Sequence, residues 1–397
     1  MSLVREKIEQ AAGIVDEKGV DLWLTFARET GSNPDPILDL IYGTTCTWHS
    51  AFIITRGGDA VAIVGRLEVA NTEATGAYDE VSGYDASIRD DLLAALERFD
   101  PKRIAVNYST SSVMADGLSH GMWLTLNSYL EGTPYAGRLE SSEEIIAALR
   151  GRKSAVELER IAASCDAAQE ILHRVTGFLK PGVTEKQVAE FIAERVEEMG
   201  LEPAWDPIHC PAVFTGPESA GAHAGPTERP VERGHILNID FGVRKDGYCS
   251  DLQRTWYVLR EGEERAPEAV AHGFETIVEA IKKSAAAIRP GMAGHEIDAV
   301  ARGHIVGAGY DEYKHALGHQ VGRVAHDGGG LLAPRWERYG NLPDLPIEAE
   351  QVYTLEPRLT VEGHGIATVE EEIVVTDDGC RYLSRPQTEI YLVSRRE

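Results

Sequence analysis

The chain has 397 residues, 43% of them apolar, and its 64 acidic side chains outnumber 39 basic ones to give a formal net charge of -25. The length predicts two domains, and the negative charge argues against nucleic acid or an anionic lipid surface as a main partner, because both carry the same sign. No apolar run approaches the ~20 residues that span a bilayer, no secretory signal is visible, and the five cysteines form no CxxC pair, so we expect a cytoplasmic protein with reduced thiols.

Residues 1–140 alternate helical and strand-like patterns, which predicts a small α/β domain. The expected elements are, in order, a helix over 2–18, a strand over 21–27, a hairpin over 51–65 that turns at Gly57-Gly58, a helix near 88–99 and a strand over 103–109. We find no catalytic motif in this region.

Residues 133–154 contain Pro, Gly and Ser and precede a long periodic helix, so we place the joint between the domains here and expect the second domain over 150–397. The helix is expected to end at Lys180-Pro181-Gly182, and Thr184 with Gln187 offers a capping box for the next helix. One face of the long helix carries apolar residues spaced by three and four, namely Leu158, Ile161, Cys165, Ala168, Leu172, Val175 and Leu179.

The same helical arrangement returns later in the chain, which indicates a weak internal repeat. KPGVTEKQVAEF is matched by RPGMAGHEIDAV, where a helix over 266–288 ends at Arg289-Pro290-Gly291 and another is expected from Glu296. Each half then continues into strands that carry two acids, Asp240 and Asp251 in the first and Glu356 and Glu370 in the second. A domain with two pseudo-symmetric halves would bring these four carboxylates to one interface.

The segment LNIDFGVRKDGYCSDLQRTW, residues 237–256, predicts a β-hairpin with its turn at Lys245-Asp246-Gly247. A loop at 245–246 would make Asp240 and Asp251 direct cross-strand partners, and a loop at 246–247 would make them diagonal neighbours. Either register puts both carboxylates on one face. Two such charges in an apolar sheet require a bound cation or a retained proton. The alternative is an Asp that caps a turn or pairs with Arg254.

Further acids and imidazoles lie nearer the end of the chain. His315, His319 and His326 stand in a Gly-rich stretch, and Glu356 and Glu370 lie in strand-like runs where an unpaired charge is costly. Because their separation of 14 (370 minus 356) is even, an odd loop or bulge near 362–364 is needed to align the two glutamates. Four carboxylates and one imidazole suit two divalent ions, Mn²⁺, Co²⁺ or Zn²⁺, and two such ions support hydrolysis of a carbonyl compound.

These motifs resemble the pita-bread metallopeptidases, which include Xaa-Pro dipeptidase (prolidase), aminopeptidase P and methionine aminopeptidase. The resemblance runs from about residue 150 to the end, and residues 1–140 are similar to the amino-terminal domain of the prolidase, aminopeptidase P and creatinase branch, which methionine aminopeptidases lack. It implies an α+β protein: a carboxy-terminal pita-bread catalytic domain with pseudo-two-fold halves, preceded by a smaller creatinase-like α/β domain. It also implies a homodimer, because relatives are often dimers.

The resemblance further implies roles for individual residues. The Asp of NIDFG, the Asp of CSDLQRT, the His of LGHQVG, the Glu of LEP and the first Glu of VEEE match the metal ligands: Asp240, Asp251, His319, Glu356 and Glu370. A hydroxide that bridges the metals would attack the scissile carbonyl, Glu356 would pass its proton to the leaving nitrogen, and His223 and His326 would donate hydrogen bonds to the developing charge. His315 matches a further active-site histidine of the pattern HxxxHxxxxxxH. Each of these last three histidines has a purely structural role as its alternative.

Three positions depart from the family pattern. Thr360 stands where many relatives have Tyr, Thr368 where they often have Arg, and Glu371 where Asp is common. These differences leave the metal ligands intact but remove a phenol and a guanidinium from their surroundings. They therefore bear on the substrate rather than on the type of reaction.

A dipeptidase must also bind the free carboxylate of the proline on the product side, for which a bidentate Arg is well suited. Arg335 and Arg338, in LLAPRWERYG, stand roughly where prolidases carry such an Arg, and Arg358 closely follows a ligand. An exposed charged loop is the alternative reading of these residues. Trp336 or Tyr339 would offer the proline an apolar wall.

The sequence thus predicts a hydrolase with two metal ions, Mn²⁺ being favoured, that cleaves the Xaa-Pro bond of dipeptides. Aminopeptidase P activity on longer Xaa-Pro peptides is the first alternative. The others are a creatinase-like hydrolase that cleaves a non-peptide C–N bond without metals, another metal-dependent amidase with a small non-peptide substrate, and a binding module without catalysis. The retained carboxylates argue against the creatinase-like enzyme and the binding module.

Overall fold

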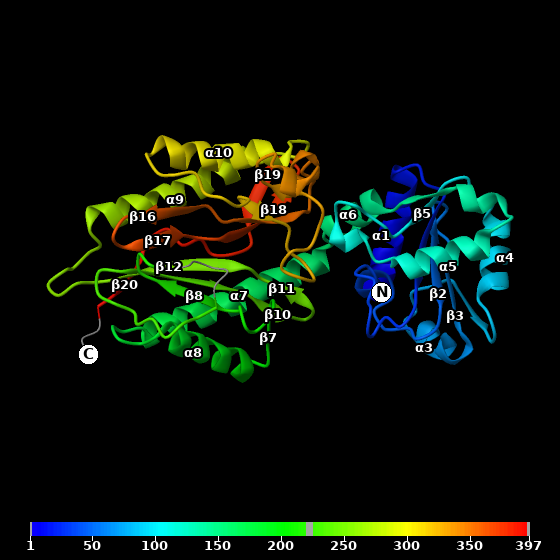
Figure 1. Ribbon diagram of the computed structural model, residues 1–397, viewed down its shortest axis with the longest axis horizontal. Helices are drawn as coiled ribbons and strands as arrows, with labels where there is room; N and C mark the ends of the chain where they lie inside the picture. The colour runs from blue at the N-terminus through cyan, green and yellow to red at the C-terminus, as the bar shows by residue number, and fades with distance from the viewer. Residues whose placement is uncertain (1, 220–224, 395–397) are drawn as a thin grey trace. The chain divides into compact units, whose positions relative to one another are not determined.

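A computed structural model describes residues 2–219 and 225–394 of the protein (Figure 1). The chain forms two compact units, Met1–Arg150 and Gly151–Glu397. Within the described ranges, no helix has the length and apolar character needed to cross a membrane.

The first unit is built on one six-stranded mixed sheet with the strand order β4-β3-β2-β1-β5-β6. Its strands are β1 (Leu22–Ala27), β2 (Ser50–Thr55), β3 (Ala60–Gly65), β4 (Glu80–Tyr84), β5 (Ile104–Val106) and β6 (Leu139–Ser141). Its helices are α1 (Leu3–Glu17), α2 (Leu38–Ile41), α3 (Val69–Ala74), α4 (Arg89–Phe99), α5 (His120–Leu130) and α6 (Glu143–Gly151). The expected helices, strands and hairpin of this region are confirmed.

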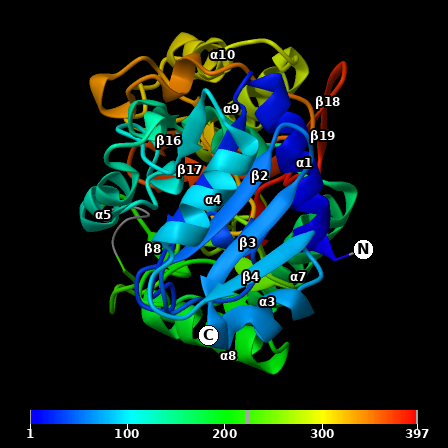
Figure 2. The ribbon, with the colours of Figure 1, turned by 90° about the vertical axis from the view of Figure 1, so that its right-hand side faces the viewer.

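Both faces of this sheet are covered, because successive residues of a strand point to opposite sides. Trp23 of β1 packs in one core with α1 and α6, whereas its neighbours Leu22 and Leu24 pack in a second core with α4 and α5. Figure 2 shows α1 and α4 flanking the strands β2 to β4. The first unit is therefore an α/β layered domain, as its alternating sequence pattern predicts.

Four helices form the outer layers of the second unit: α7 (Ala155–Phe178), α8 (Glu185–Glu198), α9 (Glu268–Ala287) and α10 (Gly294–Gly307). The predicted capping box before α8 is present, because Thr184 and Gln187 exchange side-chain and backbone hydrogen bonds. Gly182 and Gly291, at matching places in the two helical pairs, both have φ of +89°. This shared left-handed turn explains why Pro-Gly recurs in the two halves.

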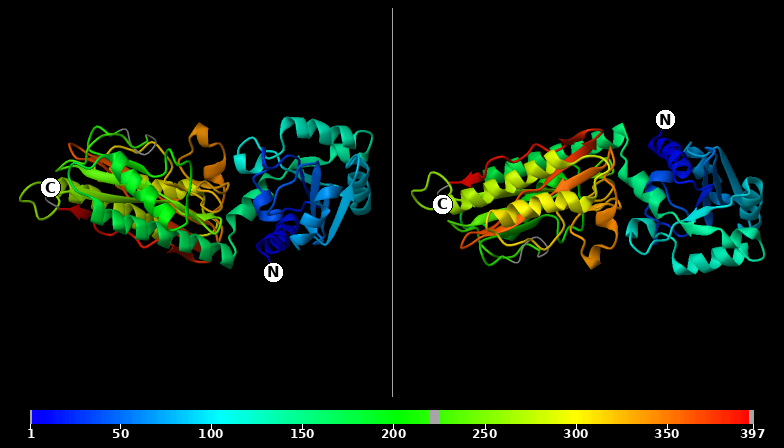
Figure 3. Two further views of the ribbon diagram at one scale, coloured as in Figure 1. Left: turned by 90° about the horizontal axis from the view of Figure 1, so that it is seen from below. Right: turned by 90° about the horizontal axis from the view of Figure 1, so that it is seen from above.

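The strands of the second unit lie between these helical pairs. In the first half they are β7 (Glu202–Pro203), β8 (Ala212–Thr215), β9 (Ile236–Phe241), β10 (Val243–Lys245), β11 (Tyr248–Cys249) and β12 (Leu252–Val258). In the second half they are β13 (Gly318–His319), β14 (Leu331–Leu332), β15 (Val352–Leu355), β16 (Arg358–Val361), β17 (Gly365–Thr368), β18 (Glu371–Thr376) and β19 (Gly379–Tyr382). The last strand, β20 (Tyr391–Val393), lies beside β12. From one side α7 and α8 cover the strands, and from the opposite side α9 and α10 do so (Figure 3).

Each half has its own hydrophobic core. Strands β8, β9 and β12 pack against α7 and α8, whereas β15 to β19 pack against α9 and α10. A bridge between Gln253 and Glu370 joins the strands of the two halves. The expected α+β architecture with two halves is therefore confirmed, and acids from both halves reach this junction.

The aspartate hairpin has the second of the two predicted registers. Lys245 pairs with Tyr248 and Gln253 with Asp240, so the loop consists of Asp246 and Gly247, and Asp240 and Asp251 are diagonal neighbours. Both loop residues have positive φ, +50° for Asp246 and +79° for Gly247. Such a turn favours Asp-Gly and disfavours Lys, which explains the choice of register.

The glutamate hairpin contains the odd loop that its spacing requires. Strand β15 pairs with β18, and β16 with β17, in one continuous register in which Leu355 faces Glu371 and Arg358 faces Thr368. The loop therefore has three residues, 362–364, and Glu356 lies opposite Glu370. Because Leu355, Leu359, Val361, Ala367 and Val369 pack into the core under α9, the two glutamates lie on the other face of the hairpin.

Candidate metal centre

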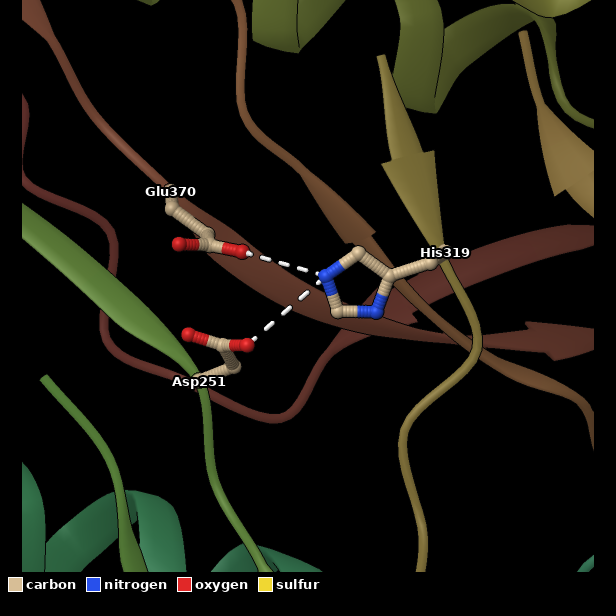
Figure 4. Close-up of side chains that lie close together, drawn as sticks. All are labelled: Asp251, His319 and Glu370. Carbon is tan, nitrogen blue, oxygen red and sulfur yellow. Dashed lines mark ion pairs between the residues drawn. The ribbon is translucent and has the colours of Figure 1, made fainter. Parts of the chain in front are cut away.

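Acids from both hairpins gather around one imidazole. The Nε2 atom of His319 lies 3.7 Å from Oδ2 of Asp251, 3.5 Å from Oε1 of Glu356 and 3.9 Å from Oε1 of Glu370. Asp251, His319 and Glu370 are buried and each offers a ligand atom within 4.8 Å of the others (Figure 4). Burial raises the pKa of Asp251, Glu356 and Glu370, and the charge of Asp240 adds to this effect, so Asp240 belongs to the same group of acids.

The main chain directly after β13 orients the His319 ring. Its Nδ1 atom lies 3.3 Å from the carbonyl oxygen of Gln320, which can only accept a hydrogen bond, so Nδ1 carries the proton and Nε2 presents a lone pair to the acids. Burial lowers the pKa of His319 to about 3, which keeps the ring neutral. Gly318 allows this close packing, because a Cβ atom there would lie 1.9 Å from the carbonyl oxygen of Thr354.

The four carboxylates are poorly satisfied by the protein itself. Burial raises the pKa of Asp240 to about 7, and burial together with the neighbouring acids raises the pKa of Asp251 and Glu370 well above the usual range. Within the described parts of the chain, Oδ1 of Asp240 and Oε1 of Glu370 are buried without a hydrogen-bond partner. A divalent cation would supply what these atoms lack, so the donor set fits a metal site.

Two residues that the sequence analysis did not single out hold the acids in place. The amide nitrogen of Gln253 donates to Oε2 of Glu370 at 3.0 Å and to Oε2 of Glu356 at 3.4 Å, and its oxygen accepts from the hydroxyl of Thr368 at 3.1 Å. The backbone N–H of Asp251 donates to Glu372 at 2.6 Å. The hairpin register places Gln253 opposite Asp240. This pairing is the sequence signal from which a role for Gln253 could have been predicted.

Arg254 does not pair with an aspartate, in contrast to one alternative reading of the hairpin. Its guanidinium lies 3.0 Å from Oε2 of Glu371, with both side chains almost fully buried. Glu371 also accepts from the hydroxyl of Ser384 at 2.5 Å and from the backbone N–H of Gln387 at 2.8 Å. Both oxygens of Glu371 are thus satisfied, which separates it from the adjacent Glu370.

A family model for "Metallopeptidase family M24" matches residues 159–377, more than half of the chain. The chain belongs to this family. An uncharacterized peptidase of Staphylococcus saprophyticus is 30% identical over 334 residues, 83% of this chain and 86% of that protein. A Xaa-Pro dipeptidase of Pyrococcus furiosus is 29% identical over 392 residues, 98% of this chain and the whole of that protein.

Solved structures share the fold of this M24 protein. A Xaa-Pro dipeptidase from Bacillus anthracis superposes with a TM-score of 0.76 at 23% identity, covering 98% of this chain and all of that chain. An X-Pro aminopeptidase from Thermotoga maritima has a TM-score of 0.72 at 22% identity, covering 97% and 99%. The predicted pita-bread fold with a preceding α/β domain is therefore confirmed. The protein is a metallopeptidase similar to Xaa-Pro dipeptidases and aminopeptidases, and its family implies metal ions and a peptide substrate.

The three histidines that the sequence analysis proposed for the active site in addition to His319 are His223, His315 and His326. The ring of His326 is exposed and lies 4.1 Å from the ring of His319, nearly perpendicular to it. His315 is half-buried, with Nδ1 2.7 Å from the carbonyl oxygen of Ala316. His223 lies outside the described residues. His326 thus lies beside a proposed ligand, and the roles of all three histidines stay predictions.

The arginines considered for carboxylate binding also differ. Arg335 is exposed and its Nε lies 2.6 Å from Oδ1 of Asp344. Arg338 donates to the carbonyl oxygen of Lys314 and lies over the rings of Trp336 and Tyr339, which stack at 5.9 Å. Arg358 is half-buried on β16, and burial lowers the pKa of its guanidinium. None of these contacts tests a role in binding substrate.

Proposed function

We propose that this M24 metallopeptidase uses two divalent ions to cleave the Xaa-Pro bond of dipeptides. We assign the ions to five ligands: Asp240, Asp251, His319, Glu356 and Glu370. The observation that supports this most directly is the group of acids around Nε2 of His319, where two buried carboxylate oxygens have no hydrogen-bond partner in the described part of the chain.

The chain's own groups suit the hydrolysis of a peptide bond. Ions held there would lower the pKa of a water molecule and polarise the scissile carbonyl. Glu356, whose pKa burial raises, can accept a proton on a carboxylate oxygen and deliver it to the leaving nitrogen. His326, exposed beside His319, can donate an N–H hydrogen bond to the charge that develops on the carbonyl oxygen, and we assign the same role to His223.

The metal and the assembly are further parts of the proposal. Carboxylate oxygens outnumber the one imidazole, which favours Mn²⁺, with Co²⁺ and Zn²⁺ as alternatives. We also propose a homodimer in the cytoplasm, with domain limits of 1–140 and 150–397; free thiols on all five cysteines suit a reducing compartment. His315, Arg335 and Arg338 remain proposed substrate contacts.

Aminopeptidase P activity is the second candidate, because relatives of both names share the fold. Arg358, whose guanidinium has no partner among the residues that the structure describes, favours proline dipeptides with a free carboxylate. A creatinase-like reaction without metals is disfavoured, since it has no use for four buried carboxylates. Another small-amide substrate is left open by Thr360 and Thr368.

Metal analysis followed by turnover tests this proposal. The purified chain, loaded with Mn²⁺, is expected to hold two ions per chain and to cleave Ala-Pro faster than Ala-Pro-Ala and longer Xaa-Pro peptides. Ala-Ala, which lacks proline, is the matched control substrate. Faster cleavage of the longer peptides would favour aminopeptidase P, and failure to cleave any Xaa-Pro peptide with metal bound would contradict both.

A further inference from the structure

Arg358 lies on the face of the glutamate hairpin that carries the site. Leu359 and Val361, its neighbours on β16, pack into the core under α9, so Arg358 points to the opposite side of the strand, as Glu356 does. The two Cα atoms are two residues apart, which corresponds to about 7 Å along a strand. The side chain of Arg358 therefore leaves the backbone close to the proposed metal ligand Glu356, on the same face of the hairpin.

The guanidinium of Arg358 has no partner in the described ranges of the chain. We find no hydrogen bond, ion pair or ring contact that involves it there, although its side chain is half-buried. The buried guanidinium groups of Arg254 and Arg302 instead contact acids, Glu371 at 3.0 Å and Asp298 at 2.7 Å. A partly desolvated cation without a counter-ion is costly, and it suits an anion that arrives with the substrate.

Short polar side chains flank Arg358 on its face of the hairpin. Its direct cross-strand partner is Thr368, whose hydroxyl donates to Gln253, and Thr360, two residues along the same face, is exposed. The two departures from the family pattern therefore place short hydroxyl side chains beside this cation, in place of a phenol and a guanidinium.

The other two candidates are already engaged. Arg335 is paired with Asp344 on an exposed loop. Arg338 donates to the carbonyl oxygen of Lys314 and lies over Trp336. Of these three arginines, Arg358 alone offers a guanidinium without a described partner.

We infer that Arg358 binds the carboxyl-terminal carboxylate of the substrate, so that the enzyme selects peptides that end at the residue after the scissile bond. This inference rests on the proposed function. In a dipeptide, the carboxylate carbon is two bonds from the scissile nitrogen, about 2.5 Å away. The group that binds it must therefore lie next to the ligands and on their face, and a guanidinium can bind both carboxylate oxygens.

Arg358→Gln tests the inference with a pair of substrates, Ala-Pro and Ala-Pro-amide, which differ only in the terminal charge. With the full Mn²⁺-loaded chain, we expect wild type to prefer the acid. In the variant, kcat/KM for Ala-Pro should fall by about 10- to 100-fold, mainly through KM, because a charge-assisted contact is lost. Cleavage of Ala-Pro-amide should change little. Arg358→Lys, which keeps the charge without the planar fork, should lie between wild type and Arg358→Gln.

Arg381→Gln on β19 is the matched control, because it makes the same change at an exposed position of the same unit. Its acid and amide rates should match those of wild type. Metal content and unfolding temperature are measured for every variant, and Arg358→Lys serves if Arg358→Gln does not fold. Equal losses on both substrates, or no loss on either, would overturn the inference while leaving the proposed function standing. A wild type that cleaves neither substrate would overturn both.

Discussion

Two neighbouring sites in the second unit contain buried acids, and they differ in how many hydrogen-bond donors the protein supplies to the carboxylates. Around His319, several carboxylates share one imidazole, and buried oxygens of Asp240 and Glu370 have no hydrogen-bond partner among the described residues. One residue further along, Glu371 receives hydrogen bonds or an ion pair on both oxygens. Burial is similar for Glu370 and Glu371, so the supply of hydrogen-bond donors is what separates the proposed ligand Glu370 from its neighbour Glu371.

The causes that shift the pKa of Glu371 and of Glu370 reflect the same difference. Burial raises the pKa of Glu371 as well, but Arg254 and the hydrogen bonds to Ser384 and Gln387 oppose that effect. At Glu370 the neighbouring acids add to burial, and Gln253 opposes it. An acid cluster of this kind costs stability in the metal-free protein, which supports the proposal that it binds a cation.

The largest expected effect is at Asp251. Asp251→Asn removes the charge of a proposed ligand while keeping its shape, so turnover of Ala-Pro should fall by at least about 1000-fold. The free energy of unfolding of the metal-free protein should not fall, since one of several like charges is gone. Steady-state kinetics and chemical denaturation measure the two quantities.

Asp246→Asn is the matched control for this change, because it makes the same substitution in the turn of the same hairpin. Asp246 is exposed with φ of +50°, a conformation that Asn tolerates well. Its turnover should stay near that of wild type. Near-full activity in Asp251→Asn would show that the assignment of this ligand is wrong.

The next effect concerns stability at the satisfied acid. Arg254→Leu leaves Glu371 buried without its counter-ion, so the free energy of unfolding should fall by about 3 kcal/mol. The double variant Arg254→Leu with Glu371→Leu should recover part of this loss, because no lone charge remains. Denaturant titrations of both variants check the prediction. A single variant as stable as wild type would mean that this ion pair contributes little.

The smallest effect is the pH dependence of stabilisation by metal. Asp240 has a pKa of about 7 in the folded metal-free protein, above the usual 3.8. Its contribution to stability is therefore fully present below pH 3.8 and is lost as pH rises through about 7. A bound ion requires the deprotonated acid, so its stabilising effect should increase over this range, by about 1.4 kcal/mol per pH unit for each proton displaced.

Unfolding temperatures of Mn²⁺-loaded and metal-stripped protein, measured from about pH 5.5 to about pH 8, check this sign. We expect the difference between the two forms to widen as pH rises. Glu371→Gln, at the satisfied acid, should leave that widening unchanged. A difference that narrows with rising pH would mean that the acids of the site are not protonated in the stripped protein.

Much of the site could be predicted from the sequence, because local rules decide it. The separation of Glu356 and Glu370 requires an odd loop, and the structure has one of three residues. The two-residue turn of the other hairpin left two registers open. Positive φ at both Asp246 and Gly247 decides between them, since this conformation suits Asp-Gly better than Lys-Asp.

Other parts depend on tertiary packing that no local pattern records. VEEE places three acids in a row, and only the packing of β18 sends Glu371 toward Arg254 and Glu372 toward the backbone of Asp251. The hairpin register marks Gln253 as the residue opposite Asp240, but its hydrogen bonds to Glu356 and Glu370 form only where the two halves meet. The same is true of Arg358, whose lack of a partner is visible only when its surroundings are known.

The contact between Gly318 and the carbonyl oxygen of Thr354 leaves no space for a side chain of any size. The imidazole that follows is thus positioned by two abutting main chains rather than by a movable loop. Even alanine at position 318 would force those chains apart and shift the ring from its neighbours. Activity would then be lost through a methyl group that touches neither a ligand nor the substrate.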